Sequence, residues 1–289
     1  MRIDLSVAGL KIAFEARDPR LVATVEAAWK PALRPAHAHP HRHYVVGDND
    51  RATLNGAPWS GDQELCELVP QIELDILRAV VATHSSQIIL HAGGVVLNDH
   101  LLLFVGESGA GKTSFTREAL RSGGSYLSDD LLIVGGGSVR GLARTVQFDP
   151  LPRSNPVPDY LEDCDCHSYQ VGNPQRKPTR VPLWTADHHT LEAFEPTPEK
   201  TVVVELRRAG FPISSSSTPS AGRTPFELVT NESSFEKKGD LERYRFLHAA
   251  SLMTARTYDG FFGSGPTWAL AWTHPGRDFE NLRRHLSLL

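Results

Sequence analysis

Hydrophobic and polar positions alternate along much of this chain in short stretches separated by turn residues, a pattern typical of β-strands. Two apolar runs, residues 88–97 and 101–105, flank Asn98 and Asp99, which favour a tight turn. We therefore expect an antiparallel hairpin there. Residues 114–121 fit a helix instead, so strands and helices follow one another and predict an α/β fold.

The first 83 residues predict a small α/β domain of their own. Their two opening stretches alternate as strands, and Asp18 followed by Pro19 is a helix start signal. A second, longer amphipathic helix follows, with a break near Pro70 because proline lacks the N–H that continues a helix. The expected elements are strands at 3–7 and 10–14 and helices at 18–29 and 63–83.

Residues 84–289 predict a second, larger domain. Within it, residues 138–148 fit a returning strand. The next segment, 149–182, is rich in proline and polar residues and predicts a long surface loop, which in a compact domain is usually functional or disordered. The remaining elements are expected as strands at 201–206 and 267–272, a flexible turn at 214–220, and helices at 224–230, 241–256 and 279–288.

Composition and charge limit the classes of function. The 289 residues are 40% hydrophobic and carry a net charge of −4, so a basic surface for nucleic acid is not expected. Three cysteines imply no disulfide framework and favour a reducing cytoplasm. The sequence shows no secretory signal pattern and no apolar run near the ~20 residues of a membrane helix, which favours a soluble cytoplasmic protein with no membrane partner.

The residues that follow the second strand of the hairpin fit the phosphate-binding pattern G-x-x-x-x-G-K-[ST]. Its glycines let successive backbone N–H groups face phosphate oxygens, and the start of the next helix adds partial positive charge. Lys112 is then expected to reach the β- and γ-phosphates, and the Thr113 hydroxyl to bind Mg²⁺. The predicted nucleotide-binding residues are Gly106, Glu107, Ser108, Gly109, Ala110, Gly111, Lys112, Thr113 and Ser114.

A pair of carboxylates, Asp129 and Asp130, follows this loop, and His91 precedes it. If this segment is extended, the two adjacent side chains point to opposite sides, so that one carboxylate faces a metal ion and the other a substrate hydroxyl. The alternatives are that the Asp pair is a solvated turn and that the histidine is a hydrogen-bonded core residue.

Together these residues resemble the HPr kinase/phosphorylase family and its looser bacterial relatives. The resemblance rests on a histidine among small residues at 90–93, a G-[DE]-S-G-x-G-K-[ST] loop, a short helix ending at glycine, and the Asp pair, all within residues 90–134. It implies a P-loop kinase core of the HPr-kinase/PEP-carboxykinase type with a mixed sheet. It also implies ATP and Mg²⁺ as cofactors, and a homo-oligomer.

The resemblance implies a role for each matching residue. Asp129 corresponds to the general base that takes the proton of the acceptor hydroxyl, and Asp130 to the Mg²⁺ partner of Thr113. Lys112 corresponds to the catalytic lysine and His91 to a site residue near the phosphates. The implied reaction transfers the γ-phosphoryl group of ATP to a hydroxyl, that of Ser or Thr in a peptide or protein.

The identity of the acceptor is open at this point. Family members that act on the phosphocarrier protein have a Glu-x-Arg-Gly-like segment after the Asp pair, whereas residues 137–144 are GSVRGLAR. Divergent relatives, some of which look like tailoring kinases for ribosomally made peptides, lack that segment too, which favours another hydroxyl acceptor. Two alternatives are a small-molecule hydroxyl kinase and a non-catalytic ATP-binding regulatory module, in which Asp129 would have no purpose.

Other residues carry weaker indications. Several cations near the expected catalytic strands are candidates for meeting phosphate charge: Arg153, Arg176, Lys177, Arg180, Arg207 and Arg208. Four histidines alternate in a way that would suit a metal site on a strand, but two prolines among them favour a solvated loop: His37, His39, His41 and His43. The C-x-C-H sequence at 164–167 lacks a second ligand pair, so it does not by itself indicate a metal site.

Overall fold

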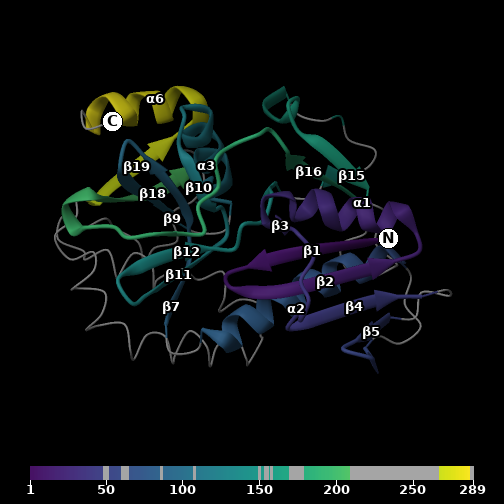
Figure 1. Cartoon of the computed structure of the whole chain (residues 1–289). Coiled ribbons are helices and arrows are strands. Elements are labelled where there is room, and N and C mark those ends of the chain that lie inside the picture. The colour runs from purple at the N-terminus through teal and green to yellow at the C-terminus, as the bar shows by residue number, and fades with distance from the viewer. Residues whose placement is uncertain are drawn as a thin grey trace, which may run out of the picture. The chain divides into compact units, whose positions relative to one another are not determined.

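The structure, a computed structural model, divides into two compact units. The described residues are 1–47, 52–59, 65–84, 87–106, 109–148, 151–152, 156, 159–168, 179–208 and 267–286. One unit contains Met1–Thr83 and Ala143–Asp187, and the other contains His84–Leu142 and His188–Leu289. Both units mix helices with strands, so the chain is α/β in the broad sense predicted, with several mixed sheets (Figure 1). The division predicted from sequence also falls after residue 83, but it assigns 143–187 to the larger domain.

The first unit is built on a six-stranded sheet with the strand order β3-β1-β2-β4-β5-β6. The predicted opening hairpin is confirmed, because β1 and β2 pair antiparallel across a turn at Ala8 and Gly9, both with positive φ. β4 pairs with β2 in parallel, since helix α1 and strand β3 carry the chain back between them. The strands are β1 Arg2–Val7, β2 Leu10–Ala16, β3 Leu33–Arg34, β4 Arg42–Val46, β5 Ala52–Leu54 and β6 Ala57–Pro58.

Two helices belong to this unit. α1 spans Pro19–Ala28 and begins at Asp18, whose side chain accepts a hydrogen bond of 2.8 Å from a backbone N–H of the first turn. α2 spans Leu65–Thr83 without the break expected at Pro70. Pro70 lies in the second turn, where its missing N–H removes one hydrogen bond and the following turns continue. Among the described residues, no helix is both long and apolar enough to cross a membrane.

The segment expected as a long surface loop, 149–182, is instead partly built of strands. With β13 it forms a small antiparallel sheet in the order β13-β16-β14, and β15 also pairs with β16. Val181 and Leu183 are fully buried on either side of Pro182. Proline argues against a strand in sequence, so this alternation does not by itself indicate one. The elements are β13 Val146–Gln147, β14 Leu151–Pro152, a 3₁₀ turn Asp159–Leu161, β15 Asp165–Ser168 and β16 Thr179–Trp184.

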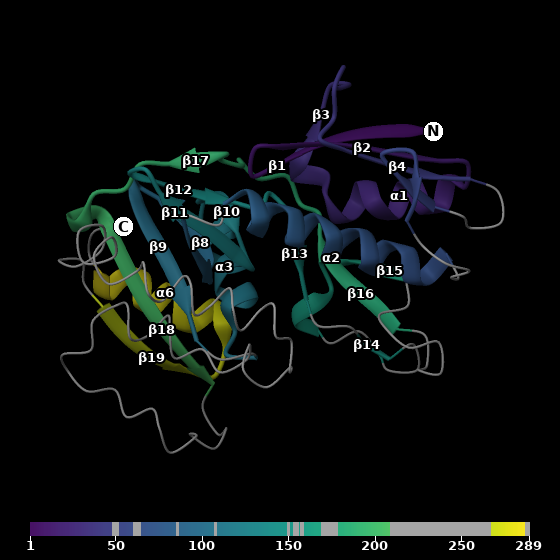
Figure 2. The same cartoon turned by 90° about the horizontal axis from the view of Figure 1, so that it is seen from below.

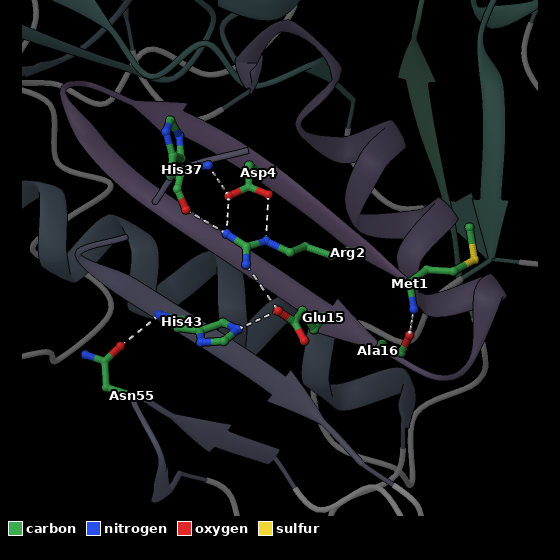
Figure 3. A network of polar contacts seen from close by, with 8 residues as sticks. All are labelled: Met1, Arg2, Asp4, Glu15, Ala16, His37, His43 and Asn55. Carbon is green, nitrogen blue, oxygen red and sulfur yellow. Dashed lines mark hydrogen bonds and ion pairs between the residues drawn. The ribbon is translucent and has the colours of Figure 1, made fainter. Parts of the chain in front are cut away.

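One face of the six-stranded sheet carries a network of charged and polar groups (Figure 3). The Arg2 guanidinium donates two hydrogen bonds of 2.8 Å to the Asp4 carboxylate and lies 3.5 Å from a Glu15 oxygen. The backbone N–H of His37 donates to the Asp4 carboxylate at 2.9 Å, and the His43 ring lies 2.9 Å from a Glu15 oxygen. The network therefore ties β1, β2 and β4 to the segment that precedes β4.

The second unit is organised around β9, in the middle of a five-stranded sheet with the order β10-β8-β9-β18-β19. The predicted hairpin is confirmed, because β8 pairs antiparallel with β9 across Asn98 and Asp99, whose φ values are 46° and 67°. On the other side β9 pairs in parallel with β18, and β18 with β19, both of which were predicted as strands (Figure 2). The strands are β8 Gly93–Leu97, β9 His100–Val105, β10 Ser125–Ser128, β18 Thr201–Arg208 and β19 Thr267–Trp272.

Helices cover one face of this sheet and a second sheet covers the other. Phe104 of β9, Phe115 of α3 (Lys112–Arg121) and Phe279 of α6 (Pro275–Leu286) form an aromatic cluster with ring centroids 5.9 and 6.3 Å apart. β9 is therefore apolar on both faces, as a central strand buried from both sides requires. Its other face packs with apolar residues of the second sheet in one core cluster: Leu101, Leu103, Val105, Ile88, Leu90, Leu132, Val134 and Val139.

The second sheet has the strand order β17-β12-β11-β7 and shows that the apolar run 88–97 is not one strand. β7 ends at His91, and β8 begins at Gly93 in the other sheet. Between them, the Ala92 N–H donates to the Asp130 carbonyl at 3.0 Å, which fixes the point where the chain changes sheet. The strands are β7 Ile88–His91, β11 Leu131–Gly135, β12 Ser138–Gly141 and β17 Ala193–Phe194.

The returning strand expected at 138–148 is also divided. β12 ends at Gly141, and Ala143 has a φ of 54°, which lies outside the β region. β13 then belongs to the first unit. A Cβ at Gly141 would overlap the Leu127 carbonyl oxygen, so only glycine allows β12 to approach β10 this closely.

The end of the described chain forms the helix α6. It begins at Pro275, one turn before the expected residue 279, because Asp278 accepts hydrogen bonds of 2.7 and 2.8 Å from the N–H groups of Thr273 and His274. Three predicted elements lie outside the described residues, namely the turn at 214–220 and the helices at 224–230 and 241–256.

We predict that acid weakens the first unit through Asp4. The hydrogen bonds from Arg2 hold the pKa of the Asp4 carboxyl below its ordinary value, although burial opposes this shift. Such a carboxyl stabilises the fold above its unfolded-state pKa of about 3.9, and the stabilisation is lost as the pH falls through the folded-state pKa. Asp4→Asn should therefore lower the free energy of unfolding by about 1–3 kcal/mol at pH 7 and by much less near pH 2.

Urea unfolding followed by tryptophan fluorescence, to which the buried Trp29 of the same unit contributes, measures this effect. Asp187→Asn is the control, because the Asp187 side chain is 97% exposed and its ion pair with Lys30 should contribute less than about 1 kcal/mol. An equal loss for Asp4→Asn at both pH values would contradict the prediction.

Candidate functional site

The predicted phosphate loop connects β9 to α3 in the second unit. Gly106 has a φ of 149°, and a Cβ there would lie 2.7 Å from the Leu206 carbonyl oxygen of β18 and 2.8 Å from the Ala110 Cβ. Gly109 and Gly111 have φ values of 80° and 103°, and Gly111 is the N-cap residue of α3. The three glycines therefore give the loop a curvature that other residues rarely adopt.

Lys112, the first residue of α3, is folded back over the loop. It is 6% exposed, and its ammonium group donates a hydrogen bond of 2.7 Å to the Gly106 carbonyl. Thr113 and Ser114 are half-buried in the same turn. The first N–H groups of a helix have no partner within the helix, and Gly111 has no side chain with which to cap them. This end of α3 is therefore suited to an anion.

The register of the strands brings the motifs to one edge of the five-stranded sheet. β8 runs antiparallel to β9 with Gly93 opposite Phe104, so His91 lies just before β8 at the edge where β9 ends in the loop. β10 runs antiparallel to β8 with Ser128 opposite Gly94, so the Asp pair follows β10 at that edge too. With strands about 4.8 Å apart, the ends of β9 and β10 are separated by roughly 10 Å.

Asp129 is the buried member of the Asp pair, at 3% exposure. Its Oδ1 accepts a hydrogen bond of 2.9 Å from the Tyr126 hydroxyl, which in turn accepts one of 3.1 Å from the Asp129 backbone N–H. A charged carboxylate is costly to bury unless it is hydrogen-bonded. The Tyr126 hydroxyl therefore helps to hold the carboxylate in place just beyond the end of β10.

Asp130 is more exposed and contacts His91. The His91 Nε2 and the Asp130 Oδ1 are 3.1 Å apart, with side chains 20% and 27% exposed. His91 also lies opposite Leu131 in the pairing of β7 with β11, directly after the Asp pair. The structure therefore brings the predicted histidine next to the predicted metal-binding carboxylate.

The Asp pair does not lie on an extended strand, so the condition for carboxylates on opposite sides of a strand is not met. Asp129 and Asp130 form the bend between β10 and β11. The Ser128 hydroxyl accepts hydrogen bonds of 3.3 Å from the N–H groups of Asp130 and Leu131, which stabilises the bend. The two carboxylates therefore differ in burial because of the bend, and not because strand neighbours alternate between faces.

Tyr126 and Ser128 are residues of this site that the sequence analysis missed. They occupy alternate positions of β10, and their hydroxyls bond the backbone of the bend that carries the carboxylates. Side-chain oxygens often accept hydrogen bonds from backbone N–H groups at turns. The signal for these two residues in the sequence was therefore a tyrosine and a serine at alternate positions just before an Asp pair. That signal is weak, since hydroxyl residues are common near turns.

Two of the predicted phosphate-sensing cations end a strand at the sheet edge that carries the loop. Arg207 and Arg208 are the last two residues of β18, which runs parallel to β9 and continues past Val105, the last residue of β9. Arg180 lies in β16 of the first unit. The predicted residues outside the described part of the chain are Glu107, Ser108, Arg153, Arg176 and Lys177.

Three of the four alternating histidines contact protein groups of the first unit. The His37 Nε2 lies 3.1 Å from the Leu5 carbonyl oxygen, and the His41 ring accepts a hydrogen bond of 2.9 Å from the Lys11 N–H. His43 lies in β4 and contacts a carboxylate of β2. Within the part of the chain that the structure describes, no three or more His, Cys, Asp or Glu residues are grouped to hold a metal ion.

No protein-family model and no curated protein matches the chain. The assignment of the site therefore rests on the loop, the histidine and the Asp pair, and on their meeting at one edge of one sheet.

We predict that Gly106→Ala disrupts the second unit more than Gly109→Ala. Both glycines have positive φ, so alanine is strained at each by roughly 1–3 kcal/mol. Only at Gly106 would the Cβ meet backbone, 2.7 Å from the Leu206 carbonyl oxygen, whereas no described atom lies within 4 Å of a Cβ at Gly109. Gly106→Ala should therefore lower the free energy of unfolding by about 1–3 kcal/mol more. Urea unfolding measures the difference, and equal losses would contradict a tight contact between the loop and β18.

Proposed function

We propose that this chain is an ATP- and Mg²⁺-dependent kinase that transfers the γ-phosphoryl group to a hydroxyl, that of Ser or Thr in a peptide or protein. One observation carries the proposal: a G-x-x-x-x-G-K-[ST] loop and a buried carboxylate lie at the same edge of one sheet. The loop alone would suit any nucleotide-binding protein, whereas transfer to a hydroxyl also needs a group that takes a proton. A P-loop kinase core is accordingly our proposed description of the second unit.

The loop provides the groups that a triphosphate needs. Backbone N–H groups of the loop and of the first turn of α3 are donors for phosphate oxygens. Lys112 would exchange its hydrogen bond with the Gly106 carbonyl for one with the β- or γ-phosphate. Because Lys112 is nearly buried, its charge acts in a medium where electrostatic attraction is stronger than in water.

The residues proposed to bind Mg²⁺ have suitable donor chemistry. Mg²⁺ prefers oxygen ligands, and at nucleotide sites it takes only one or two from the protein. The Thr113 hydroxyl and the Asp130 carboxylate are such oxygens, and both are partly accessible. When bound, the ion neutralises charge on the β- and γ-phosphates. His91, 3.1 Å from Asp130, would orient this carboxylate.

Asp129 is the residue that we propose as the general base. It would take the proton of the acceptor hydroxyl as the hydroxyl oxygen attacks the γ-phosphorus. Holding the two reactants in line accounts for much of the expected rate enhancement, which requires a carboxylate in a fixed position. The burial of Asp129 and its hydrogen bond to Tyr126 support this role over a module that only binds ATP.

The proposed acceptor class rests on the resemblance to HPr-kinase-like proteins. The loop, His91 and the Asp pair carry that resemblance, and they favour a Ser or Thr hydroxyl of a peptide or protein. Residues 137–144 lack the Glu-x-Arg-Gly-like core of members that act on the phosphocarrier protein. This favours an acceptor other than that protein.

Replacing Asp129 or Lys112 should abolish phosphoryl transfer and leave the fold intact. The assay follows labelled γ-phosphate from ATP with Mg²⁺ and a pool of cytosolic peptides, proteins and metabolites from the source cell. Asp129→Asn should lower transfer at least about 100-fold with ATP binding retained. Lys112→Ala should also weaken ATP binding. Matched controls are Asp99→Asn and Lys200→Ala, which break an exposed ion pair of 2.8 Å at the opposite end of β9.

Each outcome of this assay separates the candidate functions. Label on a peptide or protein that depends on Asp129 supports the proposal. Label on a metabolite would indicate the small-molecule kinase instead. Tight ATP binding without transfer to any acceptor would favour the regulatory module, and undiminished transfer by Asp129→Asn would remove the general-base assignment.

A further inference from the structure

The backbone of Tyr126 is held on both edges of its strand. On one side Tyr126 lies opposite Val95 of β8. On the other side its N–H donates to the His189 carbonyl at 2.7 Å, and its carbonyl accepts from the Leu191 N–H at 2.8 Å. The segment 188–191 therefore covers the outer edge of β10 where Tyr126 lies.

The Tyr126 side chain is also held in place, by burial, by a ring contact and by hydrogen bonds. The residue is fully buried, and the His188 ring meets the phenol ring edge-on with centroids 5.1 Å apart and an interplanar angle of 81°. Its hydroxyl donates to the Asp129 Oδ1 and accepts from the Asp129 N–H. The hydroxyl therefore makes two hydrogen bonds to Asp129, one as donor and one as acceptor.

β10 departs from regular pairing at this point. Tyr126 lies opposite Val95 and Ser128 opposite Gly94, so the register shifts by one residue between them. A β-bulge of this kind redirects side chains and is common beside active sites. Gly141 lacks the Cβ that would overlap the Leu127 carbonyl within the bulge, so the neighbouring sheet accommodates the irregularity. The bulge lies between Tyr126 and Asp129, whose carboxylate Tyr126 contacts.

We propose that Tyr126 is a positioning residue for Asp129, an inference that rests on the phosphoryl transfer proposed above. The Tyr126 hydroxyl holds the carboxylate through Oδ1, and the carboxylate receives the proton. The O–H bond of the acceptor breaks and an O–H bond to the carboxylate forms, while the acceptor oxygen bonds to the γ-phosphorus and the bond from that phosphorus to ADP breaks. The phenol keeps its own proton throughout. Without the hydroxyl the carboxylate would turn about its last torsion and be aligned for less of the time.

A purely structural role for the hydroxyl would give a different result. In that case its removal would lower stability but would not change turnover by the molecules that remain folded. Tyr44 offers a matched comparison, because it is also fully buried and donates a hydrogen bond of 2.5 Å to a carboxylate, that of Asp75, in the first unit.

The test compares Tyr126→Phe, Tyr44→Phe, Asp129→Asn and the double variant Tyr126→Phe with Asp129→Asn. Initial rates are measured at varied MgATP with a fixed amount of the cytosolic pool, and thermal unfolding checks the fold. Tyr126→Phe should lower kcat at least about tenfold with the KM for ATP within about twofold of the parent value. Tyr44→Phe should change neither, and the double variant should be no slower than Asp129→Asn alone.

Equal kcat values for Tyr126→Phe and Tyr44→Phe, with Asp129→Asn inactive, would overturn the inference and leave the proposed function intact. Absence of transfer by the unmodified protein would overturn both. If Tyr126→Phe does not fold, 4-fluorophenylalanine at position 126 replaces it, since its fluorine occupies the space of the hydroxyl but donates no hydrogen bond. We expect the same fall in kcat at an unchanged KM for ATP, whereas an unchanged kcat would overturn the inference.

Discussion

The pairing of β9 along both of its edges is the constraint on which the rest of the second unit depends. β8 bonds one edge antiparallel and β18 bonds the other in parallel, while apolar side chains pack on both faces. A slip of one residue would move every side chain of β9 to the wrong layer, so the register is strongly specified. The loop after β9 therefore begins at a fixed point, and the residues before β8 and after β10 are placed relative to it.

A bend at the end of β10 makes two identical residues chemically distinct. Asp129 is buried and bonded by a phenol, whereas Asp130 is partly open and contacts His91. Burial of an acid must be compensated by donors, and β10 carries hydroxyls at alternate positions that bond this bend. In the proposed reaction this separation assigns proton transfer to the enclosed carboxylate and metal binding to the accessible one.

Local patterns in the sequence were sufficient to predict much of this architecture. The elements that were predicted wrongly depend on contacts between residues that are distant in the sequence. The hairpin ending in β9, the strands β18 and β19 and the glycine-rich loop that follows β9 are each encoded within a few residues. The division of the run 88–97 at Ala92 depends on the Asp130 carbonyl, which no local pattern reveals. Pro182 argued against the strand β16, which pairs with three other strands. The importance of Tyr126 depends on a register shift in β10 and on its burial, neither of which a local pattern reveals.

The position of β18 has a consequence for the protein while it is being made. Thr201 pairs with Leu101, so the strand that covers this edge of β9 is synthesised one hundred residues later. At translation rates of about 5–20 residues per second, that edge stays open for roughly 5–20 s. An unpaired strand edge can pair with other chains, so the nascent protein is exposed to aggregation during this interval. The contact of Gly106 with the Leu206 carbonyl also forms only when the interval ends.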